Sequence, residues 1–400
     1  MKKLSKMIKS LIFANKKFFS GKTPFVSKDL IFILIVFFSW FLVLFLISFL
    51  FRSDPSKRLF SYFETNKNNP EILWNRANFD GVHYLSISRN GYGTYQQAFF
   101  PLYPFLIKKL TSFFGGKDLL AAFSLSNFCF LLALVFFFKL VCLDHPKEVA
   151  KNSLLFLIFF PTSFFFGSVY TESLFLLLII SSFYFARKGN FLISGILGAF
   201  ASATRIVGIF LFPALVFEWL EQKKNAKFSK IKILRNLFFL FLVPMGLLWY
   251  MSFLKIRYQD PLAFFHVQPF FGAQRSGDKI ILLYQVFWRY LKMIFTTKKD
   301  VLYFTVWQEL ITAIGFIFLL VVSYKSKIRR SYLVFSVCAF LSPTITGTFS
   351  SLPRYVLILF PCFILLGTIK NKLLRNFLLL FFGFLCLFNA SLFFRGFWVA

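Results

Sequence analysis

Long apolar runs recur along this chain, and they constrain its fold more than any other feature. A helix needs about 20 mostly apolar residues to cross the hydrocarbon core of a bilayer, and backbone polar groups inside lipid must be satisfied within the protein. Charged segments and Pro/Gly breaks divide the chain into about eleven such runs. The sequence therefore predicts an all-α polytopic membrane protein, folded as a single integral membrane domain over residues 1–400. The predicted spans are 30–51, 119–141, 152–168, 172–186, 190–205, 206–220, 234–256, 301–324, 331–347, 353–369 and 376–394.

The composition agrees with this prediction. Hydrophobic residues make up 58% of the chain, and 66 of its residues are phenylalanine, which is outside the range of ordinary soluble domains. Residues 1–29 are lysine-rich and lack the pattern of a cleavable signal peptide. We therefore expect the first span to be retained as a membrane anchor.

The basic residues lie mainly in the loops between the apolar runs. A formal net charge of +31 would suit nucleic-acid binding if it formed one patch with surface aromatic residues, but its distribution indicates membrane topology and no nucleic-acid partner. Basic loops remain in the cytoplasm, which places residues 1–29 inside and two long loops, 52–99 and 257–300, outside. We expect a prokaryotic plasma membrane, or the endoplasmic reticulum membrane in a eukaryote.

Both external loops have features of the bilayer surface. The first mixes acidic and basic residues, and it runs into an apolar, proline-broken segment, 98–109, that ends in two lysines. Such lysines extend into the headgroup region while their stems stay in apolar surroundings. The loop 257–300 mixes aromatic and polar residues. We expect it to lie at the interface and to cover a cavity at membrane level.

The stretch 78–84, with the sequence NFDGVHY, carries the first candidate for chemistry. Asp80 and His83 are three residues apart, so one helical turn would point both side chains into the same space. A carboxylate there can accept a proton from an attacking hydroxyl, as a general base does. The imidazole of His83 would orient the acid or contact a phosphate. The alternative is a solvated aspartate with an unrelated histidine nearby.

Glu172 is the more unusual acid, because the sequence around it offers no adjacent cation. An unpaired carboxylate at the membrane boundary is costly, so a partner from elsewhere in the fold is expected. Arg205, Arg354 or the hydroxyls of a ligand are the candidates. The alternative is that Glu172 only caps a helix.

Arg205 and Arg354 lie at predicted span ends on the same side as the two acids. A guanidinium group presents two parallel N–H donors that match two phosphate oxygens. Their shared side favours anion binding, although a single arginine at such a place is usually an interface anchor.

No cofactor is predicted. The five cysteines lie in or beside apolar runs without metal-ligand spacing, and nucleotide-binding, nucleophile-elbow and zinc-protease motifs are absent. A divalent metal stays open as a requirement, but no ligands for one are indicated.

With these residues in view, the chain resembles the PIG-V family of GPI mannosyltransferases and their prokaryotic relatives, within the GT-C superfamily of polyprenol-dependent glycosyltransferases. The matching stretches are FDGVHY (79–84) with GY (91–92), AFFPLYP (98–104), and FP (160–161) through YTESLF (170–175). Weaker matches are ATR (203–205) and PRY (353–355). The doubled acidic motif of many GT-C enzymes is absent, since Gly81 and Val82 follow Asp80.

The resemblance implies a GT-C-like helix bundle with a catalytic aspartate in the first external loop, a role that transfers to Asp80. It implies a hexosyltransferase that moves a sugar, most naturally mannose, from a dolichyl- or undecaprenyl-phosphate donor to a glycan or glycolipid hydroxyl with inversion. Glu172 would assist catalysis by positioning the acceptor or pairing with an arginine. Residues expected to contact substrate are His83, Tyr84, Tyr170, Arg205 and Arg354.

Two other classes compete with this interpretation. A transporter or lipid flippase would use the same charges to line a pathway, but such proteins place them near the bilayer midplane between related halves. A lipid-linked phosphotransferase or acyltransferase would more often show an acidic metal cluster or an embedded histidine.

Overall fold

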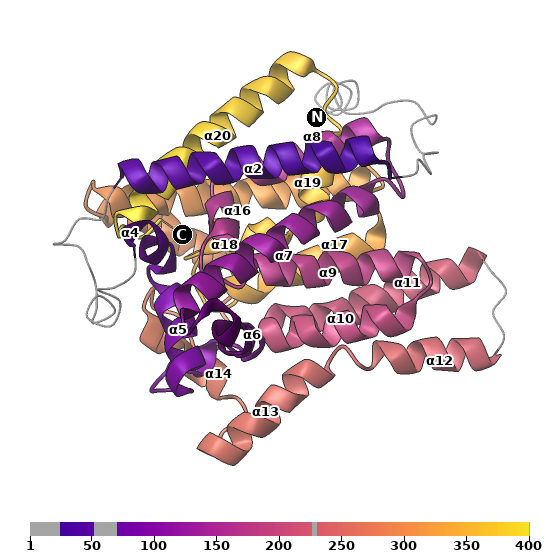
Figure 1. The fold of residues 1–400 in the computed structure, drawn as a ribbon, viewed down its shortest axis with the longest axis horizontal. Coiled ribbons are helices and arrows are strands. Elements are labelled where there is room, and N and C mark those ends of the chain that lie inside the picture. Colours follow the sequence, from indigo (N-terminus) through magenta and orange to yellow (C-terminus); the bar gives the residue numbers. More distant parts are fainter. Residues whose placement is uncertain (1–24, 52–69, 226–229, 400) are drawn as a thin grey trace.

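The computed structural model describes residues 25–51, 70–225 and 230–399, and over these ranges it contains helices and no strands. The basic segment before residue 25 and residues 52–69 of the first long loop lie outside the described residues. The helices pack side by side as a bundle (Figure 1). The chain is thus an all-α protein, as predicted.

Five segments of the described chain are long and apolar enough to cross a membrane. Four are continuous helices, and the fifth, Ile233–Tyr258, is divided by a turn before Pro244. Proline removes a backbone donor and starts a new helix readily. The elements are α2 (Ser27–Leu50), α7 (Asp118–Val141), α16 (Val301–Lys325), α20 (Lys372–Phe394), and the pair α12 (Lys230–Leu240) and α13 (Met245–Tyr258).

The other predicted spans correspond to shorter helices. They are α8 (Lys147–Phe159), α9 (Glu172–Arg187), α10 (Phe191–Thr204), α11 (Leu211–Asn225), α17 (Arg330–Thr344) and α19 (Phe360–Gly367). Predicted spans 152–168, 206–220 and 353–369 are each broken by 3-10 turns, namely η6 (Ser163–Gly167), η7 (Ile206–Phe210) and η9 (Val356–Ile358), the last preceded by α18 (Leu352–Tyr355). Irregular backbone at such depth is tolerated where other protein segments cover it.

Both long loops contain helices of their own. The first continues through α4 (Glu71–Trp74), η3 (Asn75–Ala77), α5 (Asp80–Asn90) and η4 (Gln96–Ala98), followed by α6 (Leu102–Thr111) and η5 (Ser112–Phe114). The second holds α14 (Ala263–His266), η8 (Gln268–Phe271) and α15 (Leu283–Thr296). Helices α5, α6 and α14 gather at one end of the bundle, and α11 and α12 extend to the opposite end (Figure 1).

Phenylalanine rings fill much of the interior. Phe130 and Phe166 stack with their centroids 4.3 Å apart, and Trp40 packs on Phe130 at 4.9 Å. Offset and edge-on ring pairs of this kind add to the free energy of apolar burial. Close helix contact elsewhere depends on Gly246, because a Cβ atom there would lie 2.0 Å from the carbonyl oxygen of Ala199.

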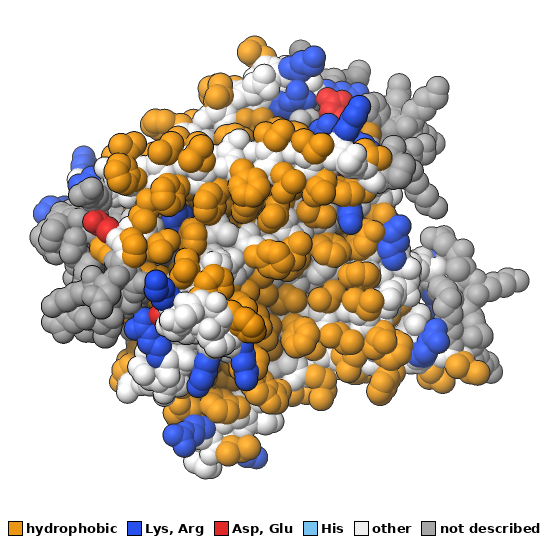
Figure 2. Space-filling model, viewed as in Figure 1, with side chains coloured by type: hydrophobic (Ala, Val, Ile, Leu, Met, Phe, Trp, Pro, Cys, Tyr) orange, Lys and Arg blue, Asp and Glu red, His pale blue; other side chains and the backbone are white. Residues whose placement is uncertain are grey.

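Large apolar side chains also cover the outside of the bundle. Figure 2 shows them across the face formed by α2, α7, α9 and α10. On α2, for example, Ile35, Phe38 and Leu42 are each more than half exposed. Apolar surface of this extent is foreign to a soluble monomer and suits contact with lipid. The chain is a membrane protein.

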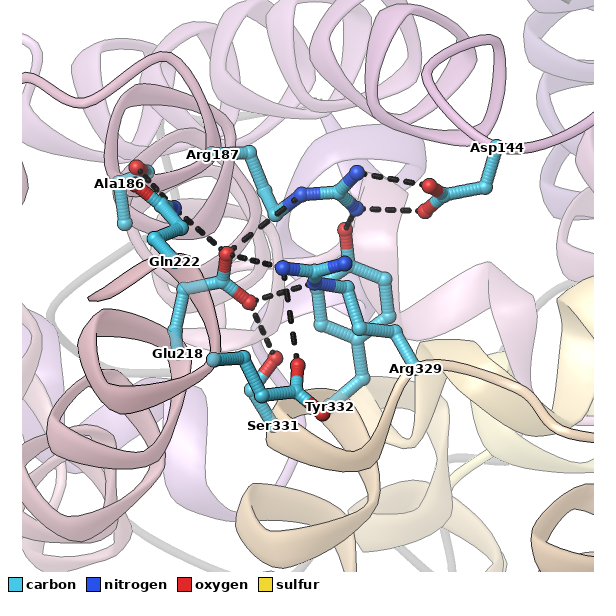
Figure 3. Close-up of polar contacts among 9 residues, drawn as sticks. Asp144, Ala186, Arg187, Glu218, Gln222, Arg329, Ser331 and Tyr332 are labelled. Atoms are coloured by element: carbon cyan, nitrogen blue, oxygen red, sulfur yellow. Dashed lines mark hydrogen bonds and ion pairs between the residues drawn. The ribbon is translucent and has the colours of Figure 1, made fainter. Parts of the chain in front are cut away.

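A buried polar network joins four parts of the chain at the end of α9 that bears Arg187 (Figure 3). Glu218 is fully buried, and its carboxylate accepts hydrogen bonds from Arg329 Nε at 2.6 Å and from Ser331 Oγ at 2.7 Å. Arg187 lies 3.5 Å from the same carboxylate and also donates to both oxygens of Asp144. The network therefore fastens α9, α11 and the start of α17 together.

Replacement of Glu218 by alanine is expected to lower the free energy of unfolding by about 3–5 kcal/mol, because it leaves the partly buried Arg187 and Arg329 without the buried counter-ion that they share. Thermal unfolding of the purified protein in detergent measures this. The control is Glu148→Ala, since the Glu148 side chain is 75% exposed in its pair with Arg375, and such pairs contribute little. Equal, small shifts for both variants would contradict a stabilising role for the network.

Candidate active site

The site is built around the first turn of α5, which begins at Asp80. The preceding residue, Phe79, has φ 60° and ψ −114°, a conformation that is strained for a residue with a side chain. Its ring is held by Trp398 at 5.1 Å and by Phe393 at 5.9 Å. Packing against the end of the described chain thus stabilises the turn that starts α5.

Gly81 explains why the residue after Asp80 is small. A Cβ atom at this position would lie 3.1 Å from both the carbonyl oxygen of Val169 and the Cβ atom of Ala77. The first turn of α5 therefore rests directly on the backbone that leads into α9. This contact brings Asp80 close to the acid at the start of α9.

Arg76 also stabilises the start of α5, through hydrogen bonds to neighbouring segments. Its guanidinium group is buried and donates to the carbonyl oxygens of Leu44 at 3.0 Å and Gly167 at 3.3 Å. Its own carbonyl oxygen accepts from Val169 N at 3.0 Å. These bonds tie α2, η3 and the segment before α9 into one support for α5.

A chain of ion pairs links the four charged residues that the sequence singled out. Arg354 Nη1 lies 2.6 Å from Asp80 Oδ2, and Arg354 Nε lies 3.4 Å from Glu172 Oε1. The same oxygen of Glu172 is 3.0 Å from Arg205 Nη1. Glu172 opens α9 as its first residue, and both of its predicted arginine partners are present.

Aromatic rings hold the two guanidinium groups in place. Arg205 and Arg354 both lie over the ring of Tyr355, 5.0 and 5.2 Å from its centroid. Arg354 also lies over Tyr170 at 5.1 Å and Phe165 at 5.4 Å. Cation–π contacts strengthen where water is excluded, so these arginines are oriented by more than their carboxylate partners.

The charge of Arg354 sets the ionisation of Asp80. Burial of the carboxyl group opposes ionisation, but the charge and hydrogen bond of Arg354 outweigh it, so the pKa of Asp80 is lowered from its usual value of 3.8. The more distant charge of Arg275 acts in the same direction. Asp80 is consequently a carboxylate at neutral pH.

His83 and Tyr84 follow on α5. The His83 ring stacks on Phe99 with centroids 4.7 Å apart, and its Nδ1 lies 3.4 Å from Gln96 Nε2. Burial lowers the pKa of His83 in spite of the opposing effect of Asp80, so the imidazole is neutral at pH 7. The buried Tyr84 hydroxyl lies 3.5 Å from Thr171 Oγ1.

These side chains border one cavity of about 940 Å³. Its charged and titratable lining consists of Asp80, His83, Tyr84, Tyr95, Glu172, Arg205, Arg275, Arg354 and Tyr355. Its apolar lining includes Phe100, Ile206, Val207, Phe210, Phe264, Phe265, Phe270, Phe271 and Ile358. The cavity thus combines charged side chains with apolar ones, the latter coming mainly from η7, from the second loop and from the segment before α6.

Tyr170 differs from the other candidates in its position. It is 1% exposed, it does not line the cavity, and its hydroxyl donates to the carbonyl oxygen of Asn78 at 2.6 Å. It lies behind Arg354 and joins the turn before α5 to the start of α9. Its position is that of a support for the site.

Arg275 and Tyr355 are cavity residues that the sequence did not single out. Arg275 was visible in the sequence only as a polar residue of the second loop. Tyr355 was visible only as the neighbour of Arg354. Nothing in the local spacing connects residue 275 with residues 80 or 354, because that proximity arises from packing of distant segments. For residues 25–51, 70–225 and 230–399, no cluster of three or more His, Cys, Asp and Glu side chains is positioned to hold a metal ion.

The helical fold and apolar surface are those of a membrane protein, and the cavity lined by charged side chains is its candidate active site. A model of the family described as Mannosyltransferase (PIG-V) matches residues 25–268. The chain belongs to this family and is a membrane mannosyltransferase, a glycosyltransferase. No curated protein sequence matches the chain.

Proposed function

We propose that this mannosyltransferase takes mannose from a polyprenyl-phosphate donor, dolichyl or undecaprenyl, and transfers it to a hydroxyl of a glycan or glycolipid with inversion. The observation that supports this best is the cavity itself. A carboxylate and several guanidinium groups share it with walls of phenylalanine and isoleucine. A sugar phosphate suits the charged side chains, and a polyprenyl chain suits the apolar ones.

Asp80 is the proposed general base. Its Oδ2 atom is held by Arg354, while Oδ1 has no hydrogen bond from another described residue. Oδ1 accepts the proton of the acceptor hydroxyl as the acceptor oxygen attacks the anomeric carbon. The bond between that carbon and the phosphate oxygen breaks, and its electron pair leaves on the polyprenyl phosphate. Attack opposite the leaving group inverts the anomeric centre.

Glu172 and the arginines have separate proposed roles. Glu172 Oε1 bridges Arg205 and Arg354, so this acid positions both cations beside Asp80. Negative charge grows on the leaving phosphate during the reaction, and fixed cations stabilise it without reorganisation. His83 and Tyr84 lie where they can contact the sugar. No step in this mechanism passes through a metal ion or cofactor.

The two ends of α9 argue against a transport pathway. Glu172 begins this helix and Arg187 ends it, which separates the cavity acids from the network at the other end by about 22 Å at 1.5 Å per residue. Between these two ends α9 carries no charged side chain, so this helix does not line a charged path from one group to the other.

Donor class is tested with purified protein in lipid nanodiscs. We expect transfer of mannose from synthetic polyprenyl-phosphate mannose and a product with the anomeric configuration opposite to that of the donor. GDP-mannose should not serve as a donor under the same conditions. Transfer from GDP-mannose alone, or a product that retains the anomeric configuration of the donor, would contradict the proposal.

A pH profile tests the ionisation of Asp80. Because Arg354 lowers the pKa of Asp80 below 3.8, the carboxylate persists as the pH falls, and the titration of Asp80 alone should leave kcat flat from about pH 7 to pH 4.5. The fall in kcat caused by protonation of Asp80 is expected below the pH range in which carboxyl groups usually titrate. Protonation of His83 would add a limb at higher pH, and His83→Gln would remove that limb. A limb near pH 6 that survives this substitution contradicts the assignment.

A further inference from the structure

The charged lining of the cavity is not balanced. Three arginines and two carboxylates face it: Arg205, Arg275, Arg354, Asp80 and Glu172. Arg205 and Arg354 are engaged by the two acids. The side chain of Arg275 makes no hydrogen bond or ion pair with another residue in the part of the chain that the structure describes. The cavity therefore presents one cation that is not yet neutralised.

The turn that carries Arg275 is strained and firmly held. Gly272, Ala273 and Gln274 all have positive φ values, of 74°, 53° and 48°. Such a run is costly for residues with a Cβ atom and persists only where surrounding contacts enforce it. The strained backbone therefore sets the position from which the Arg275 side chain enters the cavity lining.

The contacts that enforce the turn come from two other segments. Arg289 of α15 donates to the carbonyl oxygens of Ala273 and Gly347, each at 2.9 Å. Ser276 N donates to the carbonyl oxygen of Thr346 at 2.8 Å. The turn is thus fastened to α15 and to the segment that leads into α18, the helix that carries Arg354.

We propose that Arg275 binds the phosphate group of the polyprenyl-phosphate donor. This assignment rests on the proposed function and specifies which cation holds the substrate. A guanidinium group matches two phosphate oxygens with two parallel N–H donors. Arg205 and Arg354 would have to release Glu172 or Asp80 to form the same pair, whereas Arg275 has no such partner to lose.

The same residue acts in the transition state. The donor phosphate is a diester with a single negative charge, and the departing polyprenyl phosphate is a monoester that gains a second. A cation fixed beside it binds the transition state more strongly than the ground state. Loss of Arg275 should therefore lower kcat and also weaken donor binding.

Binding measurements without turnover test this assignment. Short-chain polyprenyl phosphate, the uncharged polyprenol and inorganic phosphate are titrated separately into the full chain in nanodiscs. Wild-type protein should prefer the polyprenyl phosphate over both. Arg275→Gln should weaken polyprenyl phosphate binding by roughly 10- to 100-fold, the loss of a charge-assisted hydrogen-bond pair, and leave polyprenol binding unchanged. Arg275→Lys should recover part of the loss.

Lys279→Gln is the matched control, because Lys279 is an exposed cation in the same segment that does not line the cavity. It should bind as the wild type does. Arg275→Gln should also unfold close to the wild-type temperature, since it breaks no hydrogen bond or ion pair with another described residue.

The outcomes separate this inference from the proposed function. Unchanged lipid-phosphate binding by Arg275→Gln overturns the assignment, even if the enzyme transfers mannose from the proposed donor. Inorganic phosphate that binds as tightly as the lipid phosphate overturns it too, because the site would then recognise a soluble anion. If the protein binds polyprenyl phosphate through Arg275 but cannot transfer mannose from the lipid donor, the proposed function is refuted. The assignment of Arg275 as the phosphate-binding residue would still hold.

Discussion

Asp80→Asn should reduce kcat for mannosyl transfer by about 10³-fold, within the range by which a positioned general base accelerates reactions. Asparagine has nearly the same shape, and its amide oxygen can still accept the hydrogen bond from Arg354 that Asp80 Oδ2 accepts at 2.6 Å. The substitution removes the proton acceptor and little else. Initial rates at saturating donor and acceptor measure the loss, and donor affinity should change by less than about tenfold.

The control for this substitution is Asp278→Asn. Asp278 is an exposed acid of the second loop that does not line the cavity, so its removal should leave kcat unchanged. If Asp80→Asn retained more than about a tenth of the wild-type kcat, the acceptor proton would have to leave by another route.

Arg354→Gln should have the second large effect, on stability as well as on activity. Arg354 is 4% exposed and pairs with both Asp80 and Glu172. Its loss leaves Asp80 without its ion-pair partner and leaves Glu172 paired with Arg205 alone. Breaking a buried pair of this kind costs about 3–5 kcal/mol of unfolding free energy, and kcat should fall by about 10²-fold or more. Chemical unfolding in detergent and initial rates measure the two losses.

A double-mutant cycle isolates the Asp80–Arg354 pair. Asp80→Asn combined with Arg354→Gln removes both charges, so the double variant should be more stable than the sum of the single losses predicts, by about 1–3 kcal/mol. Arg354→Lys keeps the charge but lacks the planar fork and should fall between. Strict additivity of the single losses would show that the pair does not contribute to stability.

The sequence was sufficient to predict the helical architecture and much of the site. The length and spacing of the apolar runs located the long helices, because a segment surrounded by lipid must satisfy its backbone hydrogen bonds internally, and a helix does so. The breaks near Pro161, Pro244 and Pro361 were not predicted from span length alone. Glu172 indicated a distant cation, since a buried acid without one is costly.

Long-range pairing limited the rest of the prediction. Asp80 and Arg354 are 274 residues apart, and their contact depends on how η3, α9 and α18 pack together. Arg275 carried no local signal, because its importance arises from a strained turn and from the two other arginines already having acid partners. Tyr170 matched a family motif, but its hydroxyl is used within the fold.

A structure of Asp80→Asn with intact polyprenyl-phosphate mannose bound would test the proposed mechanism directly. The anomeric carbon should lie within about 6 Å of the Asn side chain at position 80, the distance spanned by a hydrogen bond to the acceptor oxygen and its approach to the carbon. The phosphate should lie against Arg275, with the lipid along the phenylalanine walls. A donor found outside this cavity, or with its anomeric carbon turned away from residue 80, would contradict the mechanism.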